Sequence, residues 1–139
     1  MKKIISIFIF MTLSIMSFSQ NEWRLYKSVS GVNIYTKNSD CYFKDGNNMN
    51  QTVVLFKLEN TTGNKITIQW DLRVWYNGVE AVNNTTPGER HVSFSIDANS
   101  SLEADCSLKK KNLYLYKKYL DFEKSKTLTK FVLENLRVS

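Results

Sequence analysis

The chain has 139 residues, of which 42% are hydrophobic, 23% are charged and 13% are aromatic, and it contains a single proline. This apolar and aromatic content excludes a disordered chain, and the single proline excludes collagen-like and proline-rich classes. One histidine, His91, and two cysteines, Cys41 and Cys106, exclude multi-histidine metal sites and four-cysteine zinc sites. The length suits one domain.

Residues 1–19 have the pattern of a secretory signal peptide. Lys2 and Lys3 precede an apolar run, and the small residues Ser17 and Ser19 occupy the −3 and −1 positions before Gln20. A membrane-spanning helix needs about 20 predominantly apolar residues, and this run is shorter. No cysteine lies at the cleavage position, so a lipoprotein is not expected. We expect residues 20–139 to be a mature domain, periplasmic or extracellular, without a membrane anchor.

Removal of this peptide changes the charge of the protein. Without Lys2 and Lys3, 17 of the 19 basic residues remain against 13 acidic ones, a net charge of +4. So small a positive charge does not by itself indicate a nucleic-acid partner, and we expect none.

The mature chain alternates between apolar and polar residues with a period of two, and clusters of Asn, Gly, Asp and Ser interrupt the alternation. This pattern predicts strands. Segment 112–122 has an alternative interpretation as an amphipathic helix, but its tyrosines and its alternation favour a strand. The predicted strands are residues 23–29, 32–37, 51–59, 66–76, 79–82, 90–97, 112–122 and 127–138.

The clearest strand is segment 66–76, whose even positions are apolar and whose odd positions are polar until Trp75. One face of it is therefore expected to be buried. Asn77-Gly78 follows, a pair typical of a type I′ hairpin turn because both positions need a positive φ.

The two cysteines are expected to form one disulfide, because the protein is exported and small domains in oxidising compartments usually pair their cysteines. A thiolate nucleophile or a metal ligand is the alternative, but Cys41 and Cys106 belong to no CxxC pattern. The bond would close a loop of roughly 65 residues and stabilise the fold by on the order of 4 kcal/mol in the chain-entropy model.

Seven or eight short strands with a turn about every ten residues predict an all-β fold, a single antiparallel β-sandwich. In order and spacing, residues 30–138 resemble an immunoglobulin-like or fibronectin-III-like sandwich, with Trp70 at the place of the core tryptophan of the third strand. Both cysteines are expected in loops, so the inter-sheet disulfide of antibody domains is not matched. The architecture is also similar to small exported sandwich proteins of Bacteroidota-type bacteria, most of them without assigned function.

The direction of the strands predicts which loops lie together. If every connection reverses the chain, the loops that carry Cys41 and Cys106 share one pole. Segments 61–65, 83–89 and 123–126 would then lie at the opposite pole, where antibody variable domains carry their recognition loops.

Two groups of residues are candidate sites of chemistry. His91 beside Arg90 suggests an acid–base group, but its position predicts an outward-facing, solvated side chain. Asp97, Glu103 and Asp105 would offer oxygen ligands to calcium, but their spacing matches no calcium loop, and a solvated turn is the alternative. We expect no metal and no cofactor.

Lysines and tyrosines are concentrated between residues 109 and 130, which suggests a surface for an acidic glycan, a lipid or an envelope protein. The alternative is that these lysines only prevent association of strand edges. Trp75 is expected either to be an exposed platform or to be covered by strand 79–82 or by the Trp23 segment. The candidate binding residues are Lys109, Lys110, Lys111, Lys124, Lys126 and Trp75.

These observations favour an exported, non-catalytic binding or structural module of the cell envelope or the exterior. One alternative is a carboxylate-based glycan hydrolase. Another is a subunit or inhibitor that docks through its edge strands, which an uncovered apolar patch would distinguish.

Overall fold

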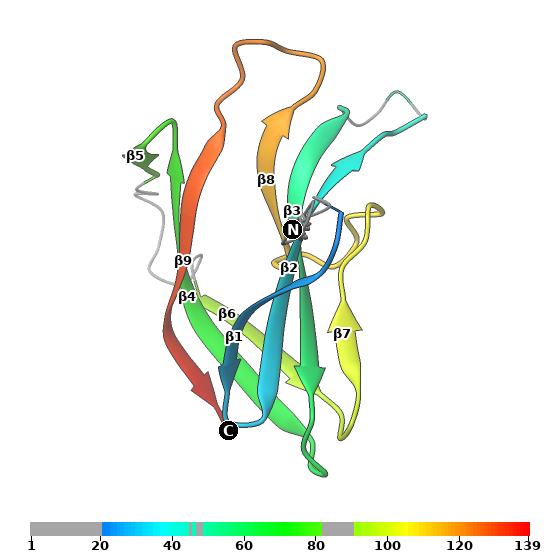
Figure 1. Ribbon diagram of the computed structural model, residues 1–139, viewed down its shortest axis with the longest axis vertical. Helices are drawn as coiled ribbons and strands as arrows, with labels where there is room; N and C mark the ends of the chain where they lie inside the picture. Colours follow the sequence, from blue (N-terminus) through cyan, green and yellow to red (C-terminus); the bar gives the residue numbers. More distant parts are fainter. Residues whose placement is uncertain (1–20, 45, 47–48, 82–90) are drawn as a thin grey trace, which may run out of the picture.

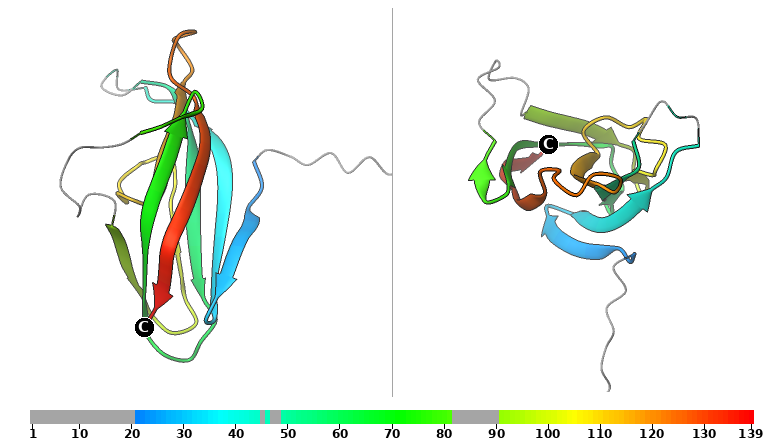
Figure 2. Two further views of the ribbon diagram at one scale, coloured as in Figure 1. Left: turned by 90° about the vertical axis from the view of Figure 1, so that its left-hand side faces the viewer. Right: turned by 90° about the horizontal axis from the view of Figure 1, so that it is seen from above.

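A computed structural model describes residues 21–44, 46, 49–81 and 91–139 of the chain. Two antiparallel sheets pack face to face (Figures 1 and 2), so the predicted all-β sandwich is confirmed. No helix that could cross a membrane occurs among these residues. The predicted signal peptide, residues 1–19, and segment 83–89 lie outside the described residues.

The first sheet is built around β3. β2 pairs with one side of β3 along its whole length, from Val32↔Asn60 to Cys41↔Gln51, and β1 pairs with the far side of β2. β7 and β8 share the other side of β3. The strands of this sheet are β1 (Arg24–Val29), β2 (Val32–Cys41), β3 (Gln51–Asn60), β7 (Ser101–Glu103) and β8 (Tyr114–Tyr119).

The second sheet is built around β4. β9 pairs with one side of β4, while β6 and the short β5 pair with the other side. Both β5 and β6 run antiparallel to β4, so the chain does not reverse its direction between them. The strands of this sheet are β4 (Ile66–Tyr76), β5 (Val79–Glu80), β6 (His91–Ile96) and β9 (Leu128–Val138).

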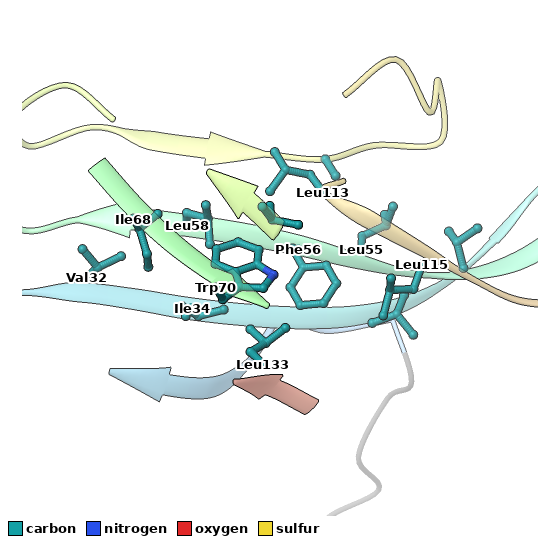
Figure 3. Packing of buried hydrophobic residues seen from close by; sticks show 14 of the residues in the cluster. Val32, Ile34, Leu55, Phe56, Leu58, Ile68, Trp70, Leu113, Leu115 and Leu133 are labelled. Carbon is teal, nitrogen blue, oxygen red and sulfur yellow. The ribbon is translucent and has the colours of Figure 1, made fainter. Parts of the chain in front are cut away.

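The core lies between the two sheets and is centred on Trp70 and Phe56 (Figure 3), whose ring centroids are 6.4 Å apart. The even positions of β4 face it, as the alternation predicted: Ile66, Ile68 and Trp70 are buried. Each such side chain stabilises the fold by about 1.5–3 kcal/mol relative to an exposed one.

β3 is buried on both of its faces. Val54 and Phe56 face the second sheet, while Val53 and Leu55 face the other way and are also buried. Ser39 pairs with Val53, and cross-strand partners share a face. The Ser39 hydroxyl lies 3.6 Å from Cys106 Sγ, so the disulfide lies on this outer face. Segment 104–113, which contains Cys106, therefore covers the outer side of β3.

The cysteines are joined as predicted, with 5.3 Å between their Cα atoms. The expectation that both lie in loops is wrong for Cys41, because β2 continues past Lys37 and ends at Cys41. Residues 38–40 are polar, which hid the end of the strand, but their pairing with β3 is unbroken. Cys106 does lie in a connecting segment.

Two further differences from the predicted strands concern one short strand and one segment. β7 was not predicted, because three residues are too few to show an alternation. Segment 112–122 contains a strand, β8, but only over Tyr114–Tyr119. The Asn77-Gly78 turn is confirmed, with φ values of 50° and 79°.

The predicted division of the loops between two poles is partly wrong. Segment 61–65 does lie at the end of β3 away from Cys41. Segment 123–126, however, lies at the same end as Cys41, because Tyr119 pairs with Gln51 and Leu128 pairs with Tyr76. The error arose because β5 and β6 run in the same direction, and β8 therefore runs opposite to the predicted direction.

Candidate binding surface at one end of the sandwich

Three connecting segments lie at the end of the sandwich drawn uppermost in Figure 1 and in the left view of Figure 2. They are the β2–β3 connection, the β4–β5 turn and the β8–β9 connection. The amide of Leu120 donates to the carbonyl of Asn50 (2.9 Å), and the amide of Asn77 donates to the carbonyl of Thr127 (2.9 Å). These hydrogen bonds place the β8–β9 connection between the other two. We call this surface the aromatic–lysine end; it comprises 42–44, 49–50, 77–79 and 117–127.

Large apolar side chains are exposed at this end. Seven large hydrophobic residues are exposed in the described part of the chain, and five of them lie here; the other two are in β1. Phe122 is 52% exposed and Tyr42 is 70% exposed. Single exposed apolar residues are normal, whereas a gathering of them marks an interaction surface. The five residues are Tyr42, Met49, Val79, Tyr119 and Phe122.

A series of aromatic contacts leads from the core to this surface. Tyr76 lies 5.9 Å from Tyr116, Tyr116 lies 4.7 Å from Tyr119, and Tyr119 lies 6.1 Å from Phe122, measured between ring centroids. The Tyr76 hydroxyl donates to the carbonyl of Tyr116 (2.9 Å). Burial, and then the neighbouring Tyr116, raises the pKa of Tyr76. The exposed rings are thus attached to the half-buried ring of Tyr76, which packs against the core.

The hydroxyl of Tyr116 holds the β8–β9 connection at two points. It accepts a hydrogen bond from the amide of Tyr119 (3.0 Å) and donates one to the carbonyl of Lys126 (3.2 Å). The Asn77 side chain accepts a further bond from the amide of Thr127 (3.0 Å). These bonds order the connection before any partner binds.

Two of the predicted lysines, Lys124 and Lys126, lie at the aromatic–lysine end, and both are exposed. Lys117 and Lys118 lie beside them in β8, and Asp121 and Glu123 are the acids between residues 117 and 126.

Lys109, Lys110 and Lys111 lie elsewhere, in the segment that covers the outer face of the first sheet. The ammonium group of Lys110 donates to the carbonyl of Glu103. The structure therefore separates the two groups of candidate lysines.

Trp75 lies on the outer face of the second sheet and is half-buried. Arg73 lies 4.9 Å and Lys130 lies 4.7 Å from the centroid of its ring. The Trp23 segment does not cover it, since the Trp23 ring packs against Lys37 of β2 (4.6 Å) and thus lies on the first sheet. Trp75 is a cation–π partner within its own sheet.

Arg73 organises the polar groups around Trp75. Its guanidinium forms two hydrogen bonds with Glu80 (2.7 and 2.8 Å) and one with Glu134 (2.8 Å). The two carboxylates raise the pKa of Arg73. One cation thus joins three strands, β4, β5 and β9.

His91 faces outward, as predicted, and forms a pair that the sequence did not reveal. Its Nδ1 lies 2.9 Å from the Asp71 carboxylate, which also accepts a hydrogen bond from the Asn135 amide (2.8 Å). The bond from Asn135, followed by that from His91, lowers the pKa of Asp71. The three residues come from β4, β6 and β9, and only the register brings them together.

The three acids weighed for calcium do not meet in one site. Asp97 pairs with Lys65 (3.3 Å), and its carbonyl accepts a bond from the Ser100 hydroxyl (2.8 Å). The side chain of Ser107, followed by its backbone amide, which donates to the Asp105 carboxylate (2.8 Å), lowers the pKa of Asp105. Within the described part of the chain, no three His, Cys, Asp or Glu side chains are grouped as metal ligands.

Comparison with known proteins adds no relative: no family model, no curated protein and no solved structure matches the chain.

Proposed function

We propose that this protein is an exported, non-catalytic binding module of the cell envelope or the exterior, and that its contact surface is the aromatic–lysine end. The gathering of five of the seven exposed large hydrophobic residues at this end carries the proposal. Aromatic side chains and methionine are enriched at protein interfaces, and monomeric proteins rarely expose such groups together without a partner.

The lysines at this end favour an acidic partner. Lys117, Lys118, Lys124 and Lys126 outnumber Asp121 and Glu123 within the same segment. A positive rim around aromatic groups steers an acidic glycan, an anionic lipid or an acidic envelope protein towards the surface. The ordered β8–β9 connection lowers the entropy that binding must otherwise overcome.

Two observations support export. Disulfides form and persist in oxidising compartments, and Cys41 and Cys106 are bonded. Residues 1–19 have the sequence pattern of a signal peptide.

The described carboxylates support a non-catalytic role. Glu80 and Glu134 both bind Arg73, and Asp71 binds Asn135 and His91. Each of these contacts joins neighbouring strands on the outer face of the second sheet. A structural role therefore explains these three carboxylates, and no catalytic role is needed for them.

The test uses mature protein, residues 20–139, and three probes: an acidic-glycan array, anionic phosphatidylglycerol vesicles and immobilised envelope protein. Phe122→Ala and the double reversal Lys124→Glu/Lys126→Glu are expected to weaken binding to the same probe, and salt is expected to weaken it further. Leu25→Ala, which removes an equally exposed residue of β1, and the triple reversal of Lys109, Lys110 and Lys111 are the controls. Binding that is absent for all three probes, or unchanged in both test variants, contradicts the proposal.

A further inference from the structure

A groove opens between the two sheets on the side where β2 faces β9. Three adjoining cavities of about 370, 410 and 300 Å³ form it, and Asn38 lines all three. Val54 and Phe131 line the first two cavities, and Lys117 lines the last two. The groove therefore follows β2 from Thr36 to Asp40.

One wall of the groove is the edge of β2 at residues 37–41, which has no described strand beside it. β1 pairs with β2 only as far as Thr36, so residues 37–41 of β2 have β3 on one side and no described strand on the other. The amide of Thr61 donates to the carbonyl of Gly31 (2.9 Å). Gly31 is an odd-numbered residue and bonds towards β3, and the register between β2 and β3 is unbroken. The backbone N–H and C=O groups of the odd residues of β2 therefore bond to β3, and those of the even residues point away from β3. The N–H and C=O groups of Asn38 thus point into the groove.

The opposite wall is the edge of β9 that faces away from β4 and pairs with no described strand. The amide of Leu133 points away from β4, because it donates to the hydroxyl of Tyr26 in β1 (3.4 Å). The register between β4 and β9 is regular from Leu133 to Phe131, so the amide of Phe131 points to the same side. Tyr26 stacks on Phe131 (5.4 Å) and closes the lower part of the groove. Above Tyr26, the gap between the sheets is open.

The inner face of β2 changes from apolar to polar where the groove begins. Val32 and Ile34 are fully buried, while Thr36, Asn38 and Asp40 continue the same face. A closed core at these positions would bury polar groups at a cost of about 1–3 kcal/mol each. The Thr52 hydroxyl donates to Asp40 (2.6 Å), whereas the Asn38 side chain has no hydrogen-bond partner among the described residues. Its amide is available to a molecule in the groove.

Most of the charged side chains that line the groove are basic. Arg24, Lys37, Lys117, Lys118 and Lys130 are basic, and Glu22 and Asp40 are acidic. The floor is apolar, since Val54, Leu128 and Phe131 line it. An occupant that fits both must carry apolar groups on one face and negative charge on the other.

We infer that the groove accepts an extended, acidic segment of a partner polypeptide, which adds a strand to β2 beside residues 37–41. An extended strand has this alternation of faces, and its backbone supplies the donors and acceptors that the edge at Asn38 needs. A glycan lacks that regular spacing. Five residues of edge span about 17 Å at 3.3 Å per residue. The inference rests on the proposed binding role. The groove borders the aromatic–lysine end and shares Lys117, Lys118, Leu120 and Thr127 with it, but the strand edge at residues 37–41 of β2 lies outside that surface.

The probe for this inference is a capped, fluorescent peptide of alternating valine and glutamate, about eight residues long. The matched control peptide has the same side chains, but every second backbone nitrogen is methylated, so that it cannot bond to a strand edge. We expect the first peptide to bind and the methylated peptide to bind at least about tenfold more weakly, which corresponds to 1.4 kcal/mol. No binding of the first peptide, or equal binding of both, would overturn the inference; equal binding would show that charge alone acts.

Two protein variants locate the site. Asn38→Trp fills the groove and is expected to weaken binding by at least about tenfold, whereas Ser93→Trp, on the outer face of β6, is expected to leave it unchanged. Phe122→Ala is also expected to leave peptide binding unchanged. A failure of this inference can therefore be told apart from a failure of the proposed binding role of the aromatic–lysine end. Loss of binding in Ser93→Trp, or full binding in Asn38→Trp, contradicts the site.

Hydrogen exchange in the wild-type protein does not depend on any variant folding. Peptide binding is expected to slow exchange at the amide of Asn38, which points into the groove, and not at Ser39, whose amide already bonds to β3. Equal changes at both amides would contradict strand addition.

Discussion

Cys41, the last residue of β2, is bonded to Cys106, which lies in the segment between β7 and β8. The bond holds segment 104–113 over the outer face of β3, where it covers Val53 and Leu55. One covalent contact thus explains why β3 is apolar on both faces, unlike β4, which is apolar on one.

Replacing both cysteines by serine is expected to lower the free energy of unfolding by about 2–5 kcal/mol, because the bond closes a long loop in the unfolded chain. Denaturant titration of the oxidised protein and the double variant measures this. Segment 104–113 should also lose amide protection in the variant. Free thiols in the purified, non-reduced protein would contradict the pairing.

The turn between β1 and β2 requires glycine for two separate reasons. Gly31 has a φ of +80°, and a Cβ at this position would lie 2.5 Å from Cγ2 of Thr62. Gly78 has nearly the same φ, +79°, but nothing within 4 Å of a built Cβ. Gly31→Ala and Gly78→Ala therefore share the cost of the left-handed backbone, about 1–3 kcal/mol, and only Gly31→Ala adds a clash. We expect Gly31→Ala to lower the melting temperature more; equal losses in the two variants would show that the contact with Thr62 is unimportant.

Asp71 makes stability depend on pH in the acid range. Its pKa in the folded protein is lower than the ordinary value of 3.8, so the stabilisation is present above that value and is lost as the pH falls through the lowered pKa. Asp71→Asn is the test, compared with wild type between about pH 5 and pH 2. The wild type is expected to be more stable at the upper end, and the difference is expected to shrink towards the lower end. A difference in stability that stays constant over this pH range would contradict the lowered pKa of Asp71.

Tyr116 should control the order of the β8–β9 connection. Tyr116→Phe removes the hydroxyl that bonds to the amide of Tyr119 and to the carbonyl of Lys126, a loss of about 0.5–1.5 kcal/mol per bond. We expect faster hydrogen exchange at the Tyr119 amide and weaker binding at the aromatic–lysine end. Tyr114→Phe is the control, since no hydrogen bond of its hydroxyl is described. The same exchange rate in wild type and Tyr116→Phe would show that the ring alone orders the connection.

The sequence was sufficient for the sandwich and most strands, because these depend on local alternation. It was sufficient for the disulfide because the chain has two cysteines and a predicted export signal. β4 shows this best: its bounds were predicted without error, since the alternation continues from Ile66 to Val74 and the Asn77-Gly78 turn follows the strand. The end of β2 was missed, because Thr36, Asn38 and Asp40 face the groove and not the core. The change from apolar to polar residues on this face of β2 was the signal in the sequence that the sheets separate there.

The sites depend on register and strand direction, which alternation does not reveal. Asp71, His91 and Asn135 meet only because β6 and β9 pair with β4 in one register. Lys124 and Lys126 were assigned to the wrong pole, because a single connection that does not reverse the chain changes the position of every later loop. Their place at the same end as Tyr42, Met49 and Val79 required the structure.

Footprinting of the lysines tests the central claim, the binding role of the aromatic–lysine end, most directly. The mature protein is acetylated alone and in complex with the probe that it binds, and the labelled lysines are identified by mass spectrometry. The account predicts that Lys124 and Lys126 are protected in the complex, while Lys109 and Lys111, which lie on the outer face of the first sheet, are labelled equally in both states. Protection of Lys109 and Lys111 with full labelling of Lys124 and Lys126 would contradict it.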